Sequence, residues 1–233
     1  MRNREKDAIE MAARKQCILE NSFRLFSEST IDKVAMNNVA DACGIGVATL
    51  YRYYKTKQAL VLDVATWLWD GYTKNDIQKL KETQKREMSA ADEYIFYLDS
   101  FIDLYRNHKD MMRFNQMFNI YVRSEKLTEE QLEPYINPIR SLEKRFHETI
   151  LKGQADGTLR TDISEQTILS TTVHIMLAVV TRYSVGLLYS NEGSKEAERE
   201  LERLKRMLLT EFTATDTCNC LTGKVQRKKQ ETG

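Results

Sequence analysis

The sequence predicts an all-α fold. Its 233 residues include only 2 prolines and 9 glycines, while leucine, glutamate, lysine, arginine and alanine, which favour helices, are common. Apolar residues recur with a helical period along most of the chain, and we find no run of alternating β-branched residues that would indicate a strand. We expect an N-terminal three-helix helix-turn-helix domain joined to a C-terminal helical bundle with a dimerising helix pair.

Three short helices are expected at the N-terminus. The first covers residues 9–28, where apolar side chains follow one face. Asp32 is expected to cap a second helix that ends before Gly44. The third covers residues 47–54, and the glycines at 44 and 46 supply the sharp reversal that joins it to the second.

Capping signals divide the rest of the chain. Ser89 precedes one helix, Thr128 with Gln131 forms a capping-box pattern for a short turn, and Asn137-Pro138 reads as a cap followed by a first-position proline. Asp162 with Glu165, and later Ser194, open the last two helices. The expected helices are 56–86, 90–107, 109–122, 138 to the Gly157 turn, 164–190 and 195–213.

The last two helices form a pair with different patterns. The helix over 164–190 is apolar on most sides, so it must be buried on most sides. The pattern fits a packed pair shared between two subunits, and it fits equally a central helix in a monomeric core. The final helix carries one clean apolar stripe, made of Ala197, Leu201, Leu204, Leu208 and Phe212.

The charge distribution favours local contact with nucleic acid. The net charge is only +1, but residues 1–60 carry 10 basic and 7 acidic side chains, whereas residues 61–216 carry 21 and 26. We therefore expect a helix-turn-helix DNA-binding domain over 1–56, followed by a helical domain over 57–216. Residues 217–233, with 4 basic side chains and 1 acidic, are expected to be a disordered basic tail.

Other classes are disfavoured. The 4 cysteines are too scattered for a disulfide framework, and the role of Cys218 and Cys220 in the tail stays open. The N-terminus lacks the apolar segment of a signal peptide, and no apolar run reaches the roughly 20 residues of a membrane helix. We expect a cytoplasmic protein without membrane contact. The 3 histidines show no metal-binding spacing, so we expect no metal, no cofactor and no enzymatic activity.

The helix over 47–54 carries the candidate DNA contacts. At 100° per residue, Leu50 and Tyr54 face the core, and Ala48 and Arg52 lie on the opposite side. Arginine can bond guanine in the major groove, and small alanine permits close approach. No acidic residue occurs from Ala42 to Leu62, which favours phosphate. The candidate contacts are Val47, Ala48, Thr49, Tyr51, Arg52, Tyr53, Lys55 and Lys57.

These residues resemble a known family. The segments ILENSFRLFSEST and VADACGIGVATLYRYYKTKQAL are similar to the DNA-binding domain of the tetracycline-repressor (TetR/AcrR) family. The resemblance implies an all-α homodimer, a variable helical effector-binding and dimerisation domain over 57–216, and a repressor released by a small molecule. It also places Thr49, Tyr51, Tyr53 and Lys57 where the family contacts DNA. This chain departs from the family in having Gly46 for the usual serine cap and Ala48 for the usual glycine.

A small-molecule effector is expected in the C-terminal domain. Residues 94–121 are rich in tyrosine, phenylalanine and methionine, which commonly line apolar cavities with a few polar groups. The candidate effector-binding residues are Phe101, Tyr105, Met112, Asn115, Gln116, Phe118 and His174.

The leading interpretation is a dimeric, sequence-specific DNA-binding transcriptional regulator, a repressor relieved by an effector, on a palindromic operator of double-stranded DNA. The alternative is a helical protein-interaction module without sequence-specific DNA binding, whose basic head contacts an acidic partner. An all-α enzyme would need a cluster of titratable residues in a pocket, and the sequence offers no recognisable one.

Overall fold

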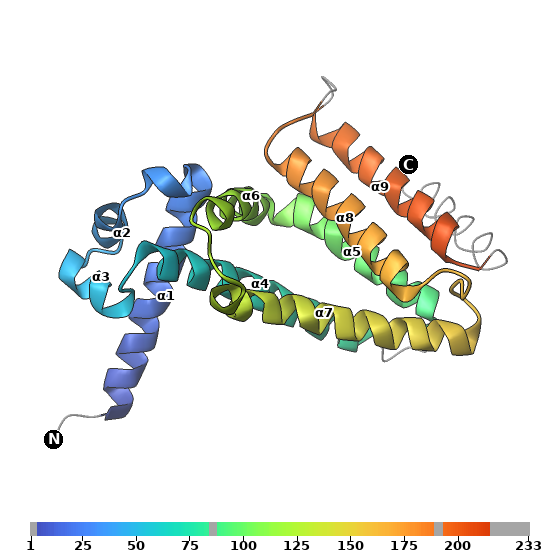
Figure 1. Cartoon of the computed structure of the whole chain (residues 1–233), viewed down its shortest axis with the longest axis horizontal. Helices are drawn as coiled ribbons and strands as arrows, with labels where there is room; N and C mark the ends of the chain where they lie inside the picture. Colours follow the sequence, from blue (N-terminus) through green and yellow to red (C-terminus); the bar gives the residue numbers. More distant parts are fainter. Residues whose placement is uncertain (1–3, 84–87, 189–192, 215–233) are drawn as a thin grey trace. The chain divides into compact units, whose positions relative to one another are not determined.

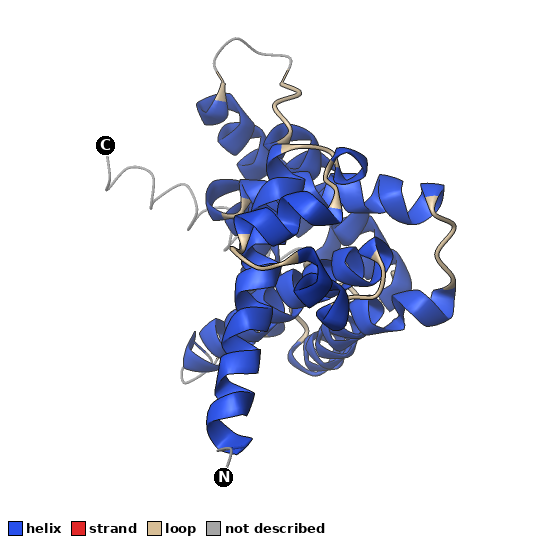
Figure 2. Cartoon of the chain, turned by 90° about the vertical axis from the view of Figure 1, so that its left-hand side faces the viewer, coloured by secondary structure: helices blue, strands red, loops and turns tan. Residues whose placement is uncertain are grey.

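The chain is almost entirely helical in the computed structural model, which describes residues 4–83, 88–188 and 193–214. Within these ranges the elements are nine α-helices and one 3-10 helix, and the only β-structure is an isolated bridge between Leu159 and Thr213. Figure 2 shows the helices in blue, joined by short tan loops. The predicted all-α fold is therefore confirmed. The tail over 217–233, with its two cysteines, lies outside the described residues.

The helices pack into two compact units. The first unit comprises residues 1–74 and 113–139, and the second comprises 75–112 and 140–233, so that the division passes through α4, α6 and α7 (Figure 1). The first unit thus contains residues 57–74 and 113–139 in addition to the expected DNA-binding domain over 1–56. The elements are α1 (Arg4–Glu28), η1 (Ile31–Lys33), α2 (Met36–Ala42), α3 (Val47–Tyr53), α4 (Lys57–Thr83), α5 (Ala90–Asn107), α6 (Lys109–Ser124), α7 (Glu129–Asp156), α8 (Glu165–Ser184) and α9 (Ser194–Phe212).

One apolar core holds the first unit together. Ile18 and Phe26 from α1, Leu50 from α3 and Leu60 from α4 are all almost fully buried in it. Phe114 of α6 stacks on Phe26 at 6.3 Å between ring centroids. Full burial of one such aliphatic side chain contributes about 1.5–3 kcal/mol, so this core fixes the position of the short α3.

The predicted start of the second helix is wrong. Asp32 lies in the 3-10 helix η1, and α2 begins only at Met36. The Asn38 side chain accepts a hydrogen bond from the Ala35 backbone N–H at 2.8 Å, which satisfies a donor at this helix start. Aspartate has a high capping propensity, but burial of Ile31 and Val34 sets a separate turn before the helix.

The prediction of Pro138 as a first helical residue is also wrong. Helix α7 begins at Glu129 and includes Pro134 and Pro138. The predicted capping box opens it, since Thr128 N–H donates to Gln131 Oε1 at 2.9 Å and Gln131 N–H donates to Thr128 Oγ1 at 3.3 Å. Tyr135 packs on Phe118 at 4.8 Å between ring centroids, so tertiary contact carries the helix through the prolines.

In the second unit α5 packs against both α8 and α9, which also lie side by side (orange and red in Figure 1). Four residues of the predicted α9 stripe, Ala197, Leu201, Leu208 and Phe212, are buried. The Ser89 cap is confirmed, because its Oγ accepts from Asp92 N–H at 3.1 Å.

Helix α8 differs from its prediction in its capping residue and in its last residue. Its cap is Ser164, whose Oγ accepts from Thr167 N–H at 3.2 Å, where Asp162 was expected. Its last residue is Ser184, whereas the prediction extended to residue 190. Gly186 follows with a φ of +83°, a conformation that suits glycine after a helix end.

Candidate nucleic-acid interface

A glycine turn sets the direction of α3. Gly44 has a φ of +62°, which a residue with a Cβ adopts at a cost. Ile45 N–H donates to the Ala40 carbonyl and Gly44 N–H to the Asp41 carbonyl, each at 3.0 Å. This pair of bonds is the Schellman pattern that closes a helix end. The predicted reversal between α2 and α3 is therefore present, and Gly46 forms the N-cap of α3.

Helix α3 has an inner and an outer face. Leu50 is fully buried and Tyr54, directly after the helix, is 5% exposed, as predicted for the core side. Ala48 and Arg52 are exposed, as predicted for the outer side. The other candidates on α3 differ in exposure. Tyr51 is exposed and Thr49 is half-buried, whereas Val47 and Tyr53 are half-buried against the core.

Tyr54 anchors the end of α3. Its hydroxyl donates to Asp63 Oδ2 on α4 at 2.6 Å, and the same carboxylate oxygen lies 2.9 Å from Lys15 Nζ on α1. Burial, followed by the hydrogen bond to Asp63, raises the pKa of Tyr54 above its usual range, so the hydroxyl stays a donor. The network ties α1, α3 and α4 together beneath the outward face.

The cationic side chains of the candidate interface differ in their exposure and in their hydrogen-bond partners. Arg52 Nη2 lies 3.2 Å from Thr49 Oγ1, a contact within α3 that directs the guanidinium along the outer face. Lys55 is exposed. Lys57 Nζ donates to the Asp32 carbonyl at 3.2 Å. Burial lowers the pKa of Lys57, and the charges of Asp32 and Glu125 oppose that shift.

The start of α4 contributes a group that the sequence analysis missed. Thr56 Oγ1 accepts from Ala59 N–H at 3.1 Å and so caps this helix just before Lys57. The signal was present locally, as a threonine three residues before the bonded N–H.

The candidate effector residues fall in both units. Asn115, Gln116 and Phe118 belong to the first unit. The Asn115 side-chain oxygen accepts from Trp69 Nε1 at 3.1 Å and from the Tyr135 hydroxyl at 3.4 Å. These partners are distant in sequence, so no local spacing could have indicated them.

The remaining candidates lie in the second unit. Tyr105 and Met112 are buried, Phe101 is half-buried and His174 is exposed on α8. Lys109 Nζ lies 4.3 Å from the centre of the Tyr105 ring. Their role as an effector site stays a prediction.

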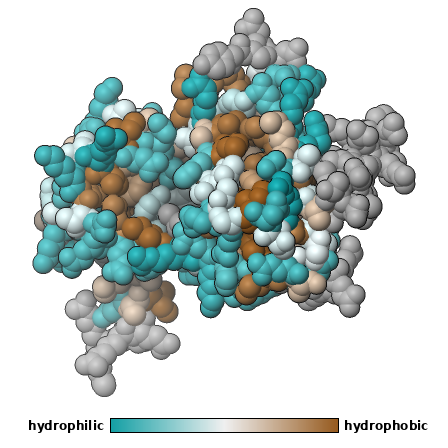
Figure 3. All heavy atoms as spheres, turned by 45° about the vertical axis from the view of Figure 1, so that its right-hand side comes forward, coloured by the Kyte–Doolittle hydropathy of each residue, from teal (hydrophilic) through white to brown (hydrophobic). Residues whose placement is uncertain are grey.

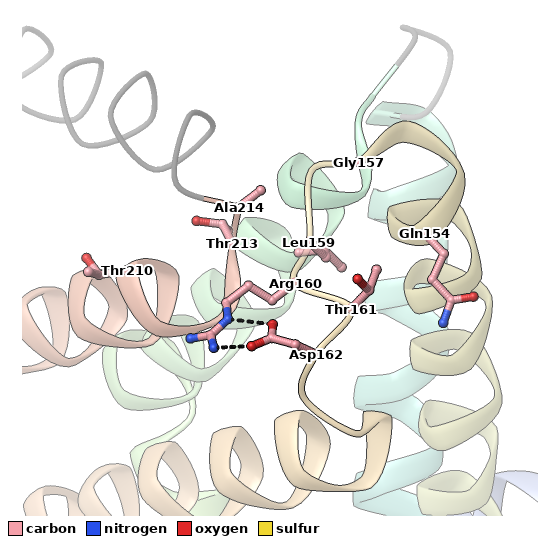
Figure 4. A pocket seen from close by; sticks show the side chains of 9 residues that line it. All are labelled: Gln154, Gly157, Leu159, Arg160, Thr161, Asp162, Thr210, Thr213 and Ala214. Carbon is pink, nitrogen blue, oxygen red and sulfur yellow. Dashed lines mark hydrogen bonds and ion pairs between the residues drawn. The ribbon is translucent and has the colours of Figure 1, made fainter.

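A pocket of about 670 Å³ in the second unit is lined by other residues. It lies beside the link between α7 and α8 and the end of α9. Figure 4 shows Arg160 facing Asp162 there, and their two contacts measure 2.6 and 2.9 Å. The Arg160 guanidinium holds the pKa of Asp162 below its usual range. Because these charges already pair with each other, the pocket offers no free charge of theirs to a ligand.

The comparisons with known proteins match this geometry. Residues 18–64 match the family model described as bacterial regulatory proteins, tetR family. An HTH-type transcriptional regulator of Staphylococcus aureus strain bovine RF122 / ET3-1, SAB2452, is 44% identical over 55 residues, which are 24% of this chain. The matched part spans only 28% of that relative's length.

Solved structures extend the likeness to most of the chain. A putative transcriptional regulator from Saccharomonospora viridis, in complex with choline, superposes with a TM-score of 0.69 at 14% identity over 87% of this chain and 99% of that one. The fatty acid degradation regulator FadR from Bacillus halodurans superposes with a TM-score of 0.65 at 12% identity over 84% and 94%. At such identities the likeness shows the fold.

The described residues contain neither a membrane-spanning helix nor a metal-binding cluster. Among the described helices, none is long and apolar enough to cross a membrane. Within the same described residues, no three side chains of histidine, cysteine, aspartate or glutamate gather so that they could hold a metal ion. Residues 18–64 thus resemble the tetR family of bacterial regulatory proteins in sequence, and most of the chain shares the fold of the matched structures.

Proposed function

We propose that this chain is a sequence-specific DNA-binding transcriptional regulator, a homodimeric repressor that a small-molecule effector releases from a palindromic operator. The single observation that carries the proposal is the outward face of α3, where Ala48 and Arg52 are exposed after a glycine turn. A helix presented in this way fits the major groove, and arginine pairs there with guanine. The matched family is one of regulatory proteins, so we propose a binding protein and not an enzyme.

The eight predicted side chains serve different parts of the DNA in this proposal. Arg52 reads a base edge, and Ala48 and Val47 allow close approach. Tyr51, Lys55 and Lys57 carry hydroxyl or ammonium groups that suit phosphate oxygens, which position the protein without reading sequence. Thr49 and Tyr53 lie beside them on α3, and the 3.2 Å contact between Thr49 and Arg52 supports a shared role in aiming the guanidinium.

The homodimer is supported by exposed apolar side chains on α8 and α9. Ile175 on α8 is 36% exposed and Met207 on α9 is 60% exposed. Figure 3, turned so that the side carrying α8 and α9 in Figure 1 comes forward, shows apolar patches on the second unit among polar atoms. A symmetric dimer would cover such side chains. Two heads on a palindromic site would then read half-sites about 34 Å apart.

An effector would act by favouring one arrangement of the dimer, which requires a few kcal/mol of differential affinity. We propose that it contacts the predicted aromatic and methionine side chains, including Phe101, Tyr105 and Met112 of the second unit. The choline complex of the Saccharomonospora viridis neighbour supports a small-molecule ligand in this fold. Thermal-shift screening of the full chain, repeated with Tyr105→Ala and with exposed His174→Ala, tests the assignment.

Selection of bound sequences from a random DNA pool tests the function directly. We expect enrichment of one palindromic sequence, and loss of binding when an effector found by the thermal-shift screen is added. Arg52→Glu is the matched negative control, because it reverses the charge on the outer face of α3. If the parent retained random duplexes as well as selected ones, the protein-interaction module would be the better interpretation.

A further inference from the structure

Two cysteines from separate helices meet in the first unit. Cys17 lies on α1 and Cys43 directly follows α2, and both are unlinked thiols with half-buried side chains. Cys43 Sγ donates to the Cys17 carbonyl oxygen at 3.7 Å, which places the Cys43 sulfur beside Cys17. Since α1 and α2 pack together, this contact is part of the interface between these two helices of the first unit.

The surroundings of the two sulfur atoms differ. The Asn21 side-chain amide donates to Cys17 Sγ at 3.4 Å, so a polar donor lies beside this sulfur. Burial, followed by the neighbouring Cys17 thiol, raises the pKa of Cys43 to about 11, which keeps Cys43 protonated at neutral pH. Cys17 is therefore the better placed of the two to meet an oxidant first, with Cys43 as its resolving partner.

We propose that Cys17 and Cys43 form a reversible disulfide on exposure to hydrogen peroxide, and that this disulfide lowers operator affinity. The effect on DNA rests on the proposed function, whereas the disulfide itself does not. Half-burial leaves a small oxidant access to the pair, and the position of the Cys43 sulfur beside Cys17 favours closure of a disulfide over further oxidation.

The reaction balances in two steps. The Cys17 thiolate attacks one peroxide oxygen, which breaks the O–O bond and gives a sulfenic acid, while the other oxygen leaves as hydroxide and takes up the thiol proton to become water. Cys43 sulfur then attacks the Cys17 sulfur and displaces the hydroxyl group as a second water. Together two thiols and one peroxide give one disulfide and two waters, and both peroxide oxygens are reduced.

The position of Cys43 explains the expected effect on DNA. It directly precedes Gly44, whose positive φ directs the turn into α3. The two sulfur atoms are not bonded in the structure, and a disulfide would hold them at about 2 Å, so its formation would draw the α2 end toward α1. A displacement of about 1 Å at the turn would carry the outer face of α3 away from the base edges, whose hydrogen bonds tolerate little misplacement.

The test uses the full chain with Cys218→Ser and Cys220→Ser, so that Cys17 and Cys43 are the only thiols left. After peroxide treatment, peptide mapping by mass spectrometry should find the Cys17–Cys43 disulfide. Gel-shift titration on the selected operator should show at least a tenfold loss of affinity, restored by dithiothreitol. Cys17→Ser and Cys43→Ser in the same background should bind operator like the reduced parent and should not respond to peroxide.

The measurements test disulfide formation, its effect on operator affinity and the proposed function separately. Absence of the disulfide after peroxide, with sulfinic acid or unmodified thiols instead, would overturn the proposed pair. A mapped disulfide with unchanged operator affinity would overturn its regulatory role. If the reduced chain selected no DNA sequence, the proposed function would fail and its regulation with it, while peptide mapping would still decide whether the pair forms.

Discussion

The exposed side chains of α3 differ from the large apolar side chains that α8 and α9 leave exposed among polar ones. On α3 the exposed residues include Arg52 and Tyr51, which can form hydrogen bonds. On α8 and α9 the exposed large residues include Ile175 and Met207, which cannot donate one. In the proposed function these exposed groups serve two kinds of recognition: the polar, cationic face of α3 suits nucleic acid, and the exposed aliphatic side chains of α8 and α9 suit a second protein surface.

Helix α3 and helix α9 also differ in the contacts that stabilise them. Helix α3 has seven residues, too few to be stable alone, and it depends on the Gly44 turn, buried Leu50 and the Tyr54 hydroxyl on Asp63. Helix α9 has 19 residues and a long buried stripe of its own. Small changes around α3 should therefore alter function, whereas the helix pair should tolerate single changes unless they reach its exposed apolar side.

The largest effect is expected from placing a charge at Ile175, the exposed aliphatic side chain of α8. Ile175→Glu would put a carboxylate on each side of a two-fold interface, at a cost of about 3–5 kcal/mol if it is buried there without a partner. Sedimentation equilibrium should show the parent as a dimer and the variant as a monomer. Leu151→Glu, on α7, is the control, since Leu151 is 50% exposed and we do not assign it to the interface. A variant that stays dimeric would refute the assignment of Ile175 to the interface.

On the outer face of α3, Arg52→Ala should cost about 1–3 kcal/mol of operator affinity, concentrated at one base pair. Lys57→Ala should weaken all sequences alike and reduce the salt dependence of binding. Gel-shift titrations on the operator, on single-base variants and on random duplex separate these effects. Parent-like binding by both variants would remove α3 from the interface.

The glycine turn allows a finer test of how α3 is held. Gly44→Ala should destabilise the first unit by about 1–2 kcal/mol, because a Cβ is strained at a positive φ. Gly46 has a φ of −68°, and a Cβ added there would meet open space, so Gly46→Ser should be tolerated and gain a few tenths of a kcal/mol as a cap. Urea titrations followed by circular dichroism compare both variants with the parent. Equal midpoints for the two would contradict the role of the turn.

The smallest effect concerns the interior of the second unit. Burial raises the pKa of Asp76 above its unfolded value, although Ser100 donates to its carboxylate at 2.8 Å. Asp76 therefore costs no stability where it is protonated in both states, below about pH 4, and destabilises the fold as the pH rises through its folded pKa. Asp76→Asn should match the parent in acid and gain in melting temperature toward pH 7. A gain that did not grow with pH would contradict this.

Local chemistry predicted part of this molecule well. The Ser89 cap, the Thr128–Gln131 box and the inward direction of Leu50 depend on residues within one or two turns, and the structure confirms them. The start of α2 and the course of α7 through Pro138 could not be predicted, because packing decides them. For the candidate sites, contacts such as Lys57 with the Asp32 carbonyl join residues far apart in sequence, which a helical period does not reveal.

The prolines in α7 have a consequence for how that helix opens. Pro134 and Pro138 have no N–H, so the carbonyls four residues earlier, those of Glu130 and Pro134, lack their usual helical partners. These two carbonyls lie about one turn apart on the same side of the helix. Fewer bonds must break there than elsewhere in the helix. Amide hydrogen exchange along α7 should therefore be fastest, for its interior, in the turns around these prolines, and unwinding should begin at that point while the Gly153 end stays closed.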